Sequence, residues 1–162
     1  MSEVFEVVNE DDEVIGTATR KECHSNPNLI HRTAHVIVFS SNFKILLQKR
    51  ALNKDTQPGK WDTAVGGHFS VGESAIEAAK REMNEELGIP LSQNIDFMLK
   101  MKIRNNIESE NVSVFSTVYD GPFFIQKEEI DEIRFWNRDE LKELVKTNEI
   151  TPNCIEELKF IL

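Results

Sequence analysis

Short runs of apolar and β-branched residues fill the first half of the chain, which is typical of strands. The runs cover Phe5–Asn9, Val14–Ala18, Ala34–Phe39, Lys44–Gln48 and Trp61–Val65. The polar segment Glu10–Asp12 separates the first two runs and is rich in turn-forming residues. This part of the pattern predicts an N-terminal hairpin within about residues 1–21, followed by three more strands.

After residue 73 the apolar residues recur at the spacing of a helix rather than of a strand, so the pattern predicts a helix. Ser74 is a suitable N-cap, and Gly88 followed by Pro90 provides stop signals after Leu87. Apolar residues recur at helical spacing in an expected stripe that can pack on a sheet, namely Ile76, Ala79, Met83 and Leu87.

The remainder of the chain predicts further strands and then two helices. The strands are expected near Phe97–Ile103, Val112–Val118 and Glu132–Trp136, and the helices near Asp139–Lys146 and Pro152–Phe160. We find no internal repeat or linker, so residues 1–162 are expected to form a single domain. The predicted class is α+β, an α/β/α sandwich with a mixed β-sheet between helices.

Charge and composition narrow the classes of function. Acidic residues outnumber basic ones by 28 to 19, giving a formal net charge of -9, which argues against a general nucleic-acid or membrane-surface binder. No apolar run approaches the ~20 residues of a membrane span, and the first residues lack the pattern of a signal peptide. With only Cys23 and Cys154, we expect free thiols and a cytoplasmic location.

Three carboxylates on the central helix form a candidate functional site. Glu82, Glu85 and Glu86 have the spacing i, i+3 and i+4, so they share one face of the helix. Such triplets are usually solvated faces, but gathered carboxylates are also the oxygen ligands that Mg²⁺ or Mn²⁺ prefers. Gly66 and Gly67 precede the helix and let the backbone approach a ligand closely, so a backbone carbonyl there could add a further ligand.

The sequence on either side of the three glutamates favours a metal site over a solvated face. Residues 67–89 resemble the Nudix box, Gly-x5-Glu-x7-Arg-Glu-U-x-Glu-Glu-x-Gly-U with U aliphatic, at every fixed position. Met83 and Ile89 stand at the aliphatic positions. The resemblance implies the Nudix fold, which agrees with the class predicted from the pattern of elements.

The resemblance also implies an activity, a metal and roles for residues. Members of this family use Mg²⁺ or Mn²⁺ to hydrolyse a diphosphate linkage in a nucleoside diphosphate joined to a group X, by water attack at phosphorus. The implied metal ligands are Glu82, Glu85, Glu86 and Gly67. Arg81 would orient the box by pairing with an acid such as Glu73 or Glu77. The implied catalytic set is Glu82, Glu85 and Arg81, although the general base is open between Glu82 and a later loop with Glu128 and Glu129.

Residues from Glu10 to about Glu110 also resemble type I isopentenyl diphosphate isomerase, which itself has a Nudix fold. The stretches that carry this resemblance are Asn9–Asp11, Gln48–Lys54, Pro58–Trp61 and Gly66–His68. It implies a second metal or polar site formed by His24, His31, His68, Glu108 and Glu110. It further implies that cationic side chains hold the substrate diphosphate, namely Arg20, Arg50 and Lys54.

One position departs from the isomerase pattern. The proton-shuttling cysteine of the isomerase falls at Gly66, which has no side chain. We therefore expect an isomerase-like scaffold with hydrolase chemistry. His35 lies inside an apolar run, and we expect it to be structural.

Two other functions stay open at this stage: an isoprenoid diphosphate isomerase and a non-catalytic nucleotide sensor. The partner is expected to be a small diphosphate, without nucleic acid or membrane. The sequence does not identify group X, and it leaves the oligomeric state open, a homodimer included.

Overall fold

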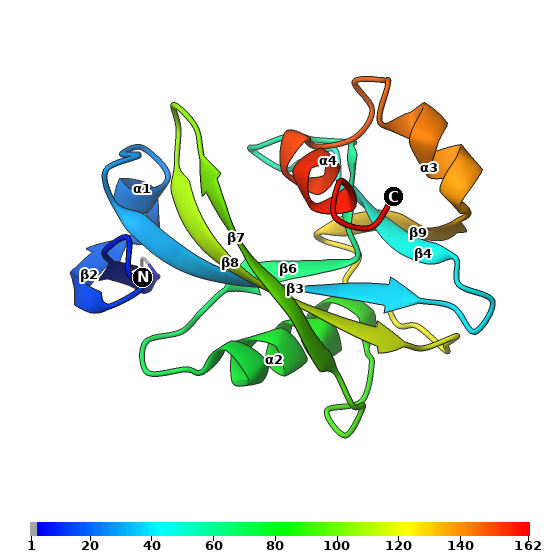
Figure 1. Cartoon of the computed structure of the whole chain (residues 1–162), viewed down its shortest axis with the longest axis horizontal. Helices are drawn as coiled ribbons and strands as arrows, with labels where there is room; N and C mark the ends of the chain where they lie inside the picture. Colours follow the sequence, from blue (N-terminus) through cyan, green and yellow to red (C-terminus); the bar gives the residue numbers. More distant parts are fainter. Residues whose placement is uncertain (1–2) are drawn as a thin grey trace.

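A mixed β-sheet with helices on both faces makes up the protein (Figure 1). A computed structural model describes residues 3–162. Its elements are β1 (Val4–Val8), β2 (Val14–Thr19), α1 (Arg20–Cys23), β3 (Ile30–Phe39), β4 (Ile45–Arg50), β5 (Trp61–Thr63), β6 (Val65–His68), α2 (Ala75–Leu87), β7 (Asp96–Arg104), β8 (Ser109–Val118), β9 (Ile130–Trp136), α3 (Arg138–Leu144) and α4 (Pro152–Leu158).

Strand β3 is the centre of the sheet. It pairs with β1, β4 and β6 in antiparallel fashion and with β8 in parallel. The outer strands complete the sheet, since β2 lies on β1, β7 on β8, and β5 and β9 on β4. The long parallel β3–β8 ladder makes the sheet mixed, which confirms the predicted class.

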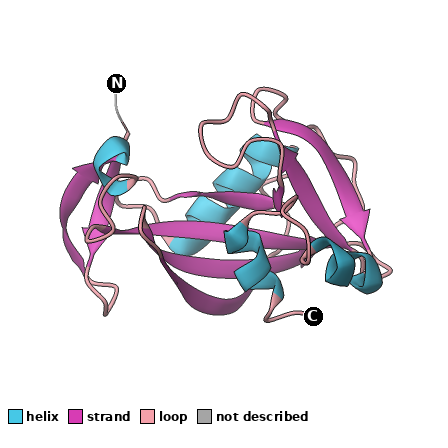
Figure 2. Cartoon of the chain, turned by 90° about the horizontal axis from the view of Figure 1, so that it is seen from above, coloured by secondary structure: helices cyan, strands magenta, loops and turns pink. Residues whose placement is uncertain are grey.

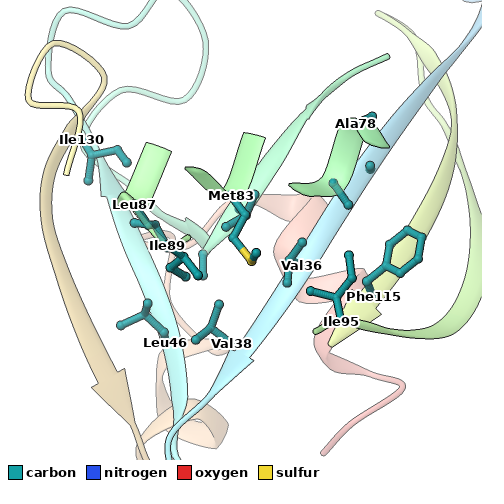
Figure 3. Packing of buried hydrophobic residues seen from close by; sticks show 14 of the residues in the cluster. Val36, Val38, Leu46, Ala78, Met83, Leu87, Ile89, Ile95, Phe115 and Ile130 are labelled. Carbon is teal, nitrogen blue, oxygen red and sulfur yellow. The ribbon is translucent and has the colours of Figure 1, made fainter. Parts of the chain in front are cut away.

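Two apolar layers hold the helices to the sheet. Helix α2 covers one face, and α3 and α4 cover the other (Figures 1 and 2). In the first layer Met83 and Leu87 of α2 pack against Val36 and Val38 of β3 and Leu46 of β4 (Figure 3). Each of these side chains is at most 1% exposed, so α2 is fixed against the sheet by dense packing.

The sequence signals of α2 are confirmed, except for one position of the apolar stripe. Ser74 accepts a hydrogen bond from the amide of Glu77 in a capping box, and Gly88 ends the helix in the left-handed conformation with φ 67°. Ile76, however, is 45% exposed, and Ala78 takes the expected place in the buried face. The predicted stripe is therefore correct at Ala79, Met83 and Leu87 and wrong at Ile76 in the first turn.

The structure differs from the predicted elements at three other places. Strand β3 begins at Ile30 rather than Ala34, because its polar first residues are held by backbone pairing with β1 and β8. The expected strand Trp61–Val65 is two strands: the chain leaves β4 after Thr63 and pairs with β3 from Val65. Helix α1 was not predicted, although Thr19 and Glu22 form a readable capping box.

The predicted N-terminal hairpin is present as β1 and β2, and ion pairs attach its turn to the sheet. Asp12 pairs with Arg32 and Lys100, and Glu10 pairs with Lys102 and Arg104. Both cysteines are buried and free. None of the helices within residues 3–162 has the length and hydropathy that crossing a membrane requires.

A buried polar contact joins α4 to the centre of the sheet. Nδ1 of His35 lies 2.5 Å from Oε2 of Glu157, and the hydroxyl of Thr63 donates to Oε1 of the same carboxylate at 2.8 Å. Burial alone lowers the pKa of His35, but the charge and hydrogen bond of Glu157 raise it to about 9. The imidazole is therefore protonated at neutral pH, and the contact is an ion pair.

The packing of α2 predicts that Met83→Ala is strongly destabilising. Removing this fully buried side chain leaves a cavity and costs about 2–5 kcal/mol of unfolding free energy. Ile76→Ala on the same helix removes a side chain that is 45% exposed, and it should cost less than about 1 kcal/mol. Urea unfolding of both variants checks this, and equal losses would contradict the packing described.

The ion pair of His35 predicts a stability that falls at alkaline pH. A group whose pKa is raised in the folded state stabilises fully below its unfolded pKa of about 6.5 and loses this stabilisation as the pH rises through about 9. Unfolding free energy should therefore fall by roughly 1–3 kcal/mol over that window. Glu157→Gln should remove most of this slope, whereas Glu156→Gln, which alters an exposed neighbour, should retain it.

Candidate functional site

The guanidinium of Arg81 organises the acidic face of α2. It donates to both carboxylate oxygens of Glu73 at 2.8 and 2.9 Å, to Glu82 at 2.8 Å and to the backbone carbonyl of His68 at 2.9 Å. Hydrogen bonding from Arg81 lowers the pKa of Glu73, so this carboxylate is charged at neutral pH. Of the two acids expected as its partner, Arg81 selects Glu73, while Glu77 caps the helix.

Two box glutamates lie directly against strand β6, because two consecutive glycines let the helix come close. A methyl group at Gly67 would lie 2.2 Å from Cδ of Glu82, so only glycine fits there. The amide of Gly66 donates to Oε2 of Glu86 at 3.3 Å, and the side-chain amide of Gln48 donates to Oε1 at 3.0 Å.

The charged forms of Glu82 and Glu86 are destabilised by burial and by repulsion from neighbouring carboxylates. Burial, followed by the charge of Glu82, raises the pKa of Glu86 well above its usual value. Burial also raises the pKa of Glu82, against the opposing effect of Arg81. A divalent cation would offset this repulsion, and a set of carboxylate oxygens suits Mg²⁺ or Mn²⁺.

Glu85 lies apart from this pair. Its side chain is 52% exposed and reaches Arg81 at 3.3 Å. Within residues 3–162, the groups of three side chains whose ligand atoms lie within 4.8 Å of one another are His24–His31–His68 and His31–Glu108–Glu110. The three box glutamates do not form a group this tight in the described part of the chain.

The five predicted histidine and glutamate residues do come together, around strand β3. His24 follows α1, His31 and His68 come from the adjacent strands β3 and β6, and Glu110 is paired with His31 in the parallel β3–β8 ladder. Nε2 of His24 lies 3.1 Å from Nε2 of His68 and 3.6 Å from Oε2 of Glu108. We call these five residues the histidine cluster.

The histidine cluster has the properties of a ligand set. Burial, followed by the charge of His24, lowers the pKa of His31 to about 4, and burial lowers the pKa of His24 and His68 as well. Their imidazoles are thus neutral, the form that binds metal ions. The ring of Phe5 stacks on His68 and His31 with centroids 4.3 and 5.6 Å apart.

His31 gives the strongest indication that a ligand is needed. It is completely buried, and neither ring nitrogen makes a well-formed hydrogen bond among residues 3–162, although the backbone of Ser109 lies near the ring and Oε2 of Glu108 lies 4.0 Å from Nε2. Such unpaired buried groups cost about 1–3 kcal/mol each. The distance of 3.1 Å between Nε2 of His24 and Nε2 of His68 also fits two nitrogens that share one ion at about 2.1 Å.

The three cationic residues expected to hold a diphosphate are each paired with a carboxylate in this structure. Arg20 pairs with Glu3 at 3.8 Å, Arg50 with Asp62 at 3.4 Å, and Lys54 with Glu129. Arg50 also donates to the carbonyl and hydroxyl of Thr56. Each therefore has a partner in this structure, and binding a phosphate would mean exchanging it.

Sequence reasoning missed two polar residues that reach Glu86 and His35 from other elements. Gln48 reaches Glu86 from β4, and Glu157 reaches His35 from α4. Signals for both exist in the sequence: Gln48 ends an apolar run, and Glu157 stands at helical spacing between the apolar residues Cys154 and Leu158.

Comparison with known proteins agrees with this geometry. The family model of the NUDIX domain matches residues 29–158. An uncharacterised Nudix hydrolase of Yersinia pestis is 34% identical over 99% of this chain and 86% of its own length. An isopentenyl-diphosphate Delta-isomerase of Dictyostelium discoideum is 40% identical over 68% of this chain and 53% of its own length.

A solved structure supports the fold. The crystal structure of DR0079 from Deinococcus radiodurans superposes with a TM-score of 0.85 at 20% identity, over 98% of both chains. Together with the complete Nudix box on α2, these matches settle the family. The chain belongs to the NUDIX domain family and is a Nudix hydrolase.

Proposed function

We propose that the protein is a divalent-metal-dependent hydrolase that cleaves a diphosphate linkage in a nucleoside diphosphate-X type substrate by water attack at phosphorus. The observation that carries this proposal is the pair Glu82 and Glu86, whose carboxylates are buried against Gly67 and Gly66 although their charges repel. Only a bound cation gives such an arrangement a clear chemical use.

Mg²⁺ or Mn²⁺ would be held by Glu82, Glu85, Glu86 and the carbonyl of Gly67. When bound, the ion would neutralise the diphosphate and lower the pKa of a water molecule. Arg81 would keep Glu82 in place through its bond of 2.8 Å and would fix the end of β6 through the carbonyl of His68. Glu85 is half-exposed at the outer side of this group and could bind from there after a change of rotamer.

Glu82 is the general base that the arrangement favours. Its carboxylate lies directly against Gly67, beside the carbonyl that would hold the ion, and burial raises its pKa against the opposing effect of Arg81. In the loop before β9, Glu129 is paired with Lys54, and Glu128 is exposed. Arg50 and Lys54, together with Arg20, remain our candidates for contacting the substrate phosphates.

We also infer a second divalent ion in the histidine cluster. Neutral imidazoles together with carboxylates suit Mn²⁺ or Zn²⁺, and such an ion would partner one of the two buried nitrogens of His31. Glu110 stands beside His31 with a pKa raised to about 7 by burial and by Glu108, so binding would also offset the cost of its charge.

The histidine cluster favours a second candidate function, an isomerase of isoprenoid diphosphates. The resemblance to the isomerases implies a metal-ligand role for the same five residues, and an isomerase is among the relatives. Gly66 speaks against this function, because the isomerase needs an acid and a base on opposite faces of its substrate and glycine offers neither. Exchange of solvent protons into isopentenyl diphosphate without phosphate release would favour it.

The hydrolase proposal predicts that Glu82→Gln and Glu85→Gln each reduce turnover by about 100-fold or more, because each removes a charged oxygen ligand. The measurement is release of phosphate and nucleotide with Mg²⁺ and Mn²⁺ from nucleoside di- and triphosphates, sugar nucleotides, dinucleotides and isopentenyl diphosphate. Glu77→Gln on the same helix is the control, since glutamine preserves the capping box.

Two results would contradict this proposal. If no substrate is turned over while nucleotides still bind to all the variants, the protein is a sensor. If Glu82→Gln lowers activity no more than Glu77→Gln, the box glutamates do not perform the chemistry.

The second-site proposal predicts metal stoichiometry. The wild type, equilibrated with Mn²⁺ and dialysed, should retain a tightly bound ion that His31→Gln and His68→Gln lose. His35→Gln is the matched control, because it changes a partly buried histidine of the same strand that lies outside the histidine cluster. Equal metal content in all four proteins would overturn the assignment.

A further inference from the structure

A row of polar side chains continues along β3 beyond the histidine cluster. His31, Thr33 and His35 alternate along the strand, so they share the face that is opposite α2. His35 pairs with Gly66 in the β3–β6 ladder. The amide of Gly66 donates to Glu86, so this one glycine lies between the acidic group and the imidazole of His35.

Gly66 leaves room for the ring of His35. A methyl group at this position would lie 3.1 Å from Cδ2 and 3.2 Å from Nε2 of that ring, closer than side chains normally approach. The ring of His35 therefore lies where a side chain at position 66 would otherwise be. The imidazole occupies the edge of the space where a side chain on β6 would stand.

The other side of the ring is fixed by α4. Nδ1 of His35 is held by Glu157, whose carboxylate is in turn held by the hydroxyl of Thr63. A carboxylate on Nδ1 sets both the orientation and the protonation of an imidazole, and it leaves Nε2–H as a directed donor.

The two side chains of the His35–Glu157 pair differ in how far they are exposed to solvent. The side chain of Glu157 is 3% exposed, whereas that of His35 is 12% exposed. The contacts found within residues 3–162 use Nδ1 only, so Nε2 is free to meet a ligand. Glu157 balances the charge of the imidazole, so what His35 offers to an anion beside the box is the N–H donor at Nε2.

We propose that His35, oriented by Glu157, donates a hydrogen bond from Nε2 to the diphosphate of the substrate, and that Gly66 is glycine to keep this contact open. His35 is then a substrate-binding residue and Glu157 a positioning residue. The inference rests on the proposed function only for the identity of the substrate, since binding of a diphosphate can be measured without turnover.

The experiment measures binding of imidodiphosphate, a diphosphate that resists hydrolysis, in excess Mg²⁺ by calorimetry. His35→Gln should weaken binding by about tenfold or more, because it removes a charged donor, and Glu157→Gln should weaken it severalfold. Glu156→Gln is the matched control: the same substitution at the adjacent, exposed position of α4 should change binding less than about twofold. In the wild type, the ¹⁵N signal of Nε2 of His35 should shift when the ligand is added.

Gly66→Ala provides an independent variant in case the loss of His35 disturbs folding. Its methyl group would press on the ring, so binding should weaken in the wild-type background. In the His35→Gln background the same change should have little further effect, because the two residues act on one contact.

The outcomes separate this inference from the proposed function. If the wild type turns over no substrate but His35→Gln still weakens imidodiphosphate binding, the inference stands and the hydrolase proposal fails. If the wild type is an active hydrolase and folded His35→Gln binds imidodiphosphate as tightly, the inference is wrong. In that case His35 and Glu157 serve only to fasten α4.

Discussion

The distance between helix α2 and strand β6 constrains the rest of the structure. Glu82 lies so close to Gly67 that no side chain fits between them, and the same approach lets the amide of Gly66 reach Glu86. The apolar layer below Met83 and Leu87 fixes this distance, so packing in the core determines where the carboxylates stand. A larger residue at either glycine would displace charged groups rather than flexible apolar ones.

Arg81 makes this close approach tolerable. It is the positive charge that the box supplies to its own glutamates, and it reaches Glu73, Glu82 and the backbone of β6 at once. A single guanidinium with several donors can do this because its geometry is planar and its charge is permanent. Lysine could neutralise one carboxylate but could not connect the helix, the preceding loop and the strand.

Local signals in the sequence predicted α2 and the box correctly. Ser74, Gly88 and the fixed spacing of the glutamates all act within one helix, so no knowledge of distant residues was needed. The beginning of β3 was missed because His31 and Arg32 are polar, and only pairing with β1 and β8 makes them part of a strand. The division into β5 and β6 was missed for a similar reason, since it reflects a change of pairing partner.

The histidine cluster was predicted from a family resemblance, whereas the contact between His35 and Glu157 was not predicted at all. His35 was expected to be structural because it lies in an apolar run, and Glu157 follows it by 122 residues. No periodicity connects positions so far apart. Pairs of this kind become visible only when the topology of the sheet and the position of α4 are known.

The parallel pairing of β3 with β8 also determines the order in which the molecule can be assembled during synthesis. A ribosome releases His24, His31 and His68 well before Glu108 and Glu110, so the histidines lack these two carboxylates until the chain reaches β8. His35 lacks its partner Glu157 for longer still, until residue 157 has left the ribosome. Contacts between distant parts of a chain form slowly, so the polar groups of this sheet face are among the last to find their partners. A nascent chain halted before β8 would carry its histidines without the acids that complete the site.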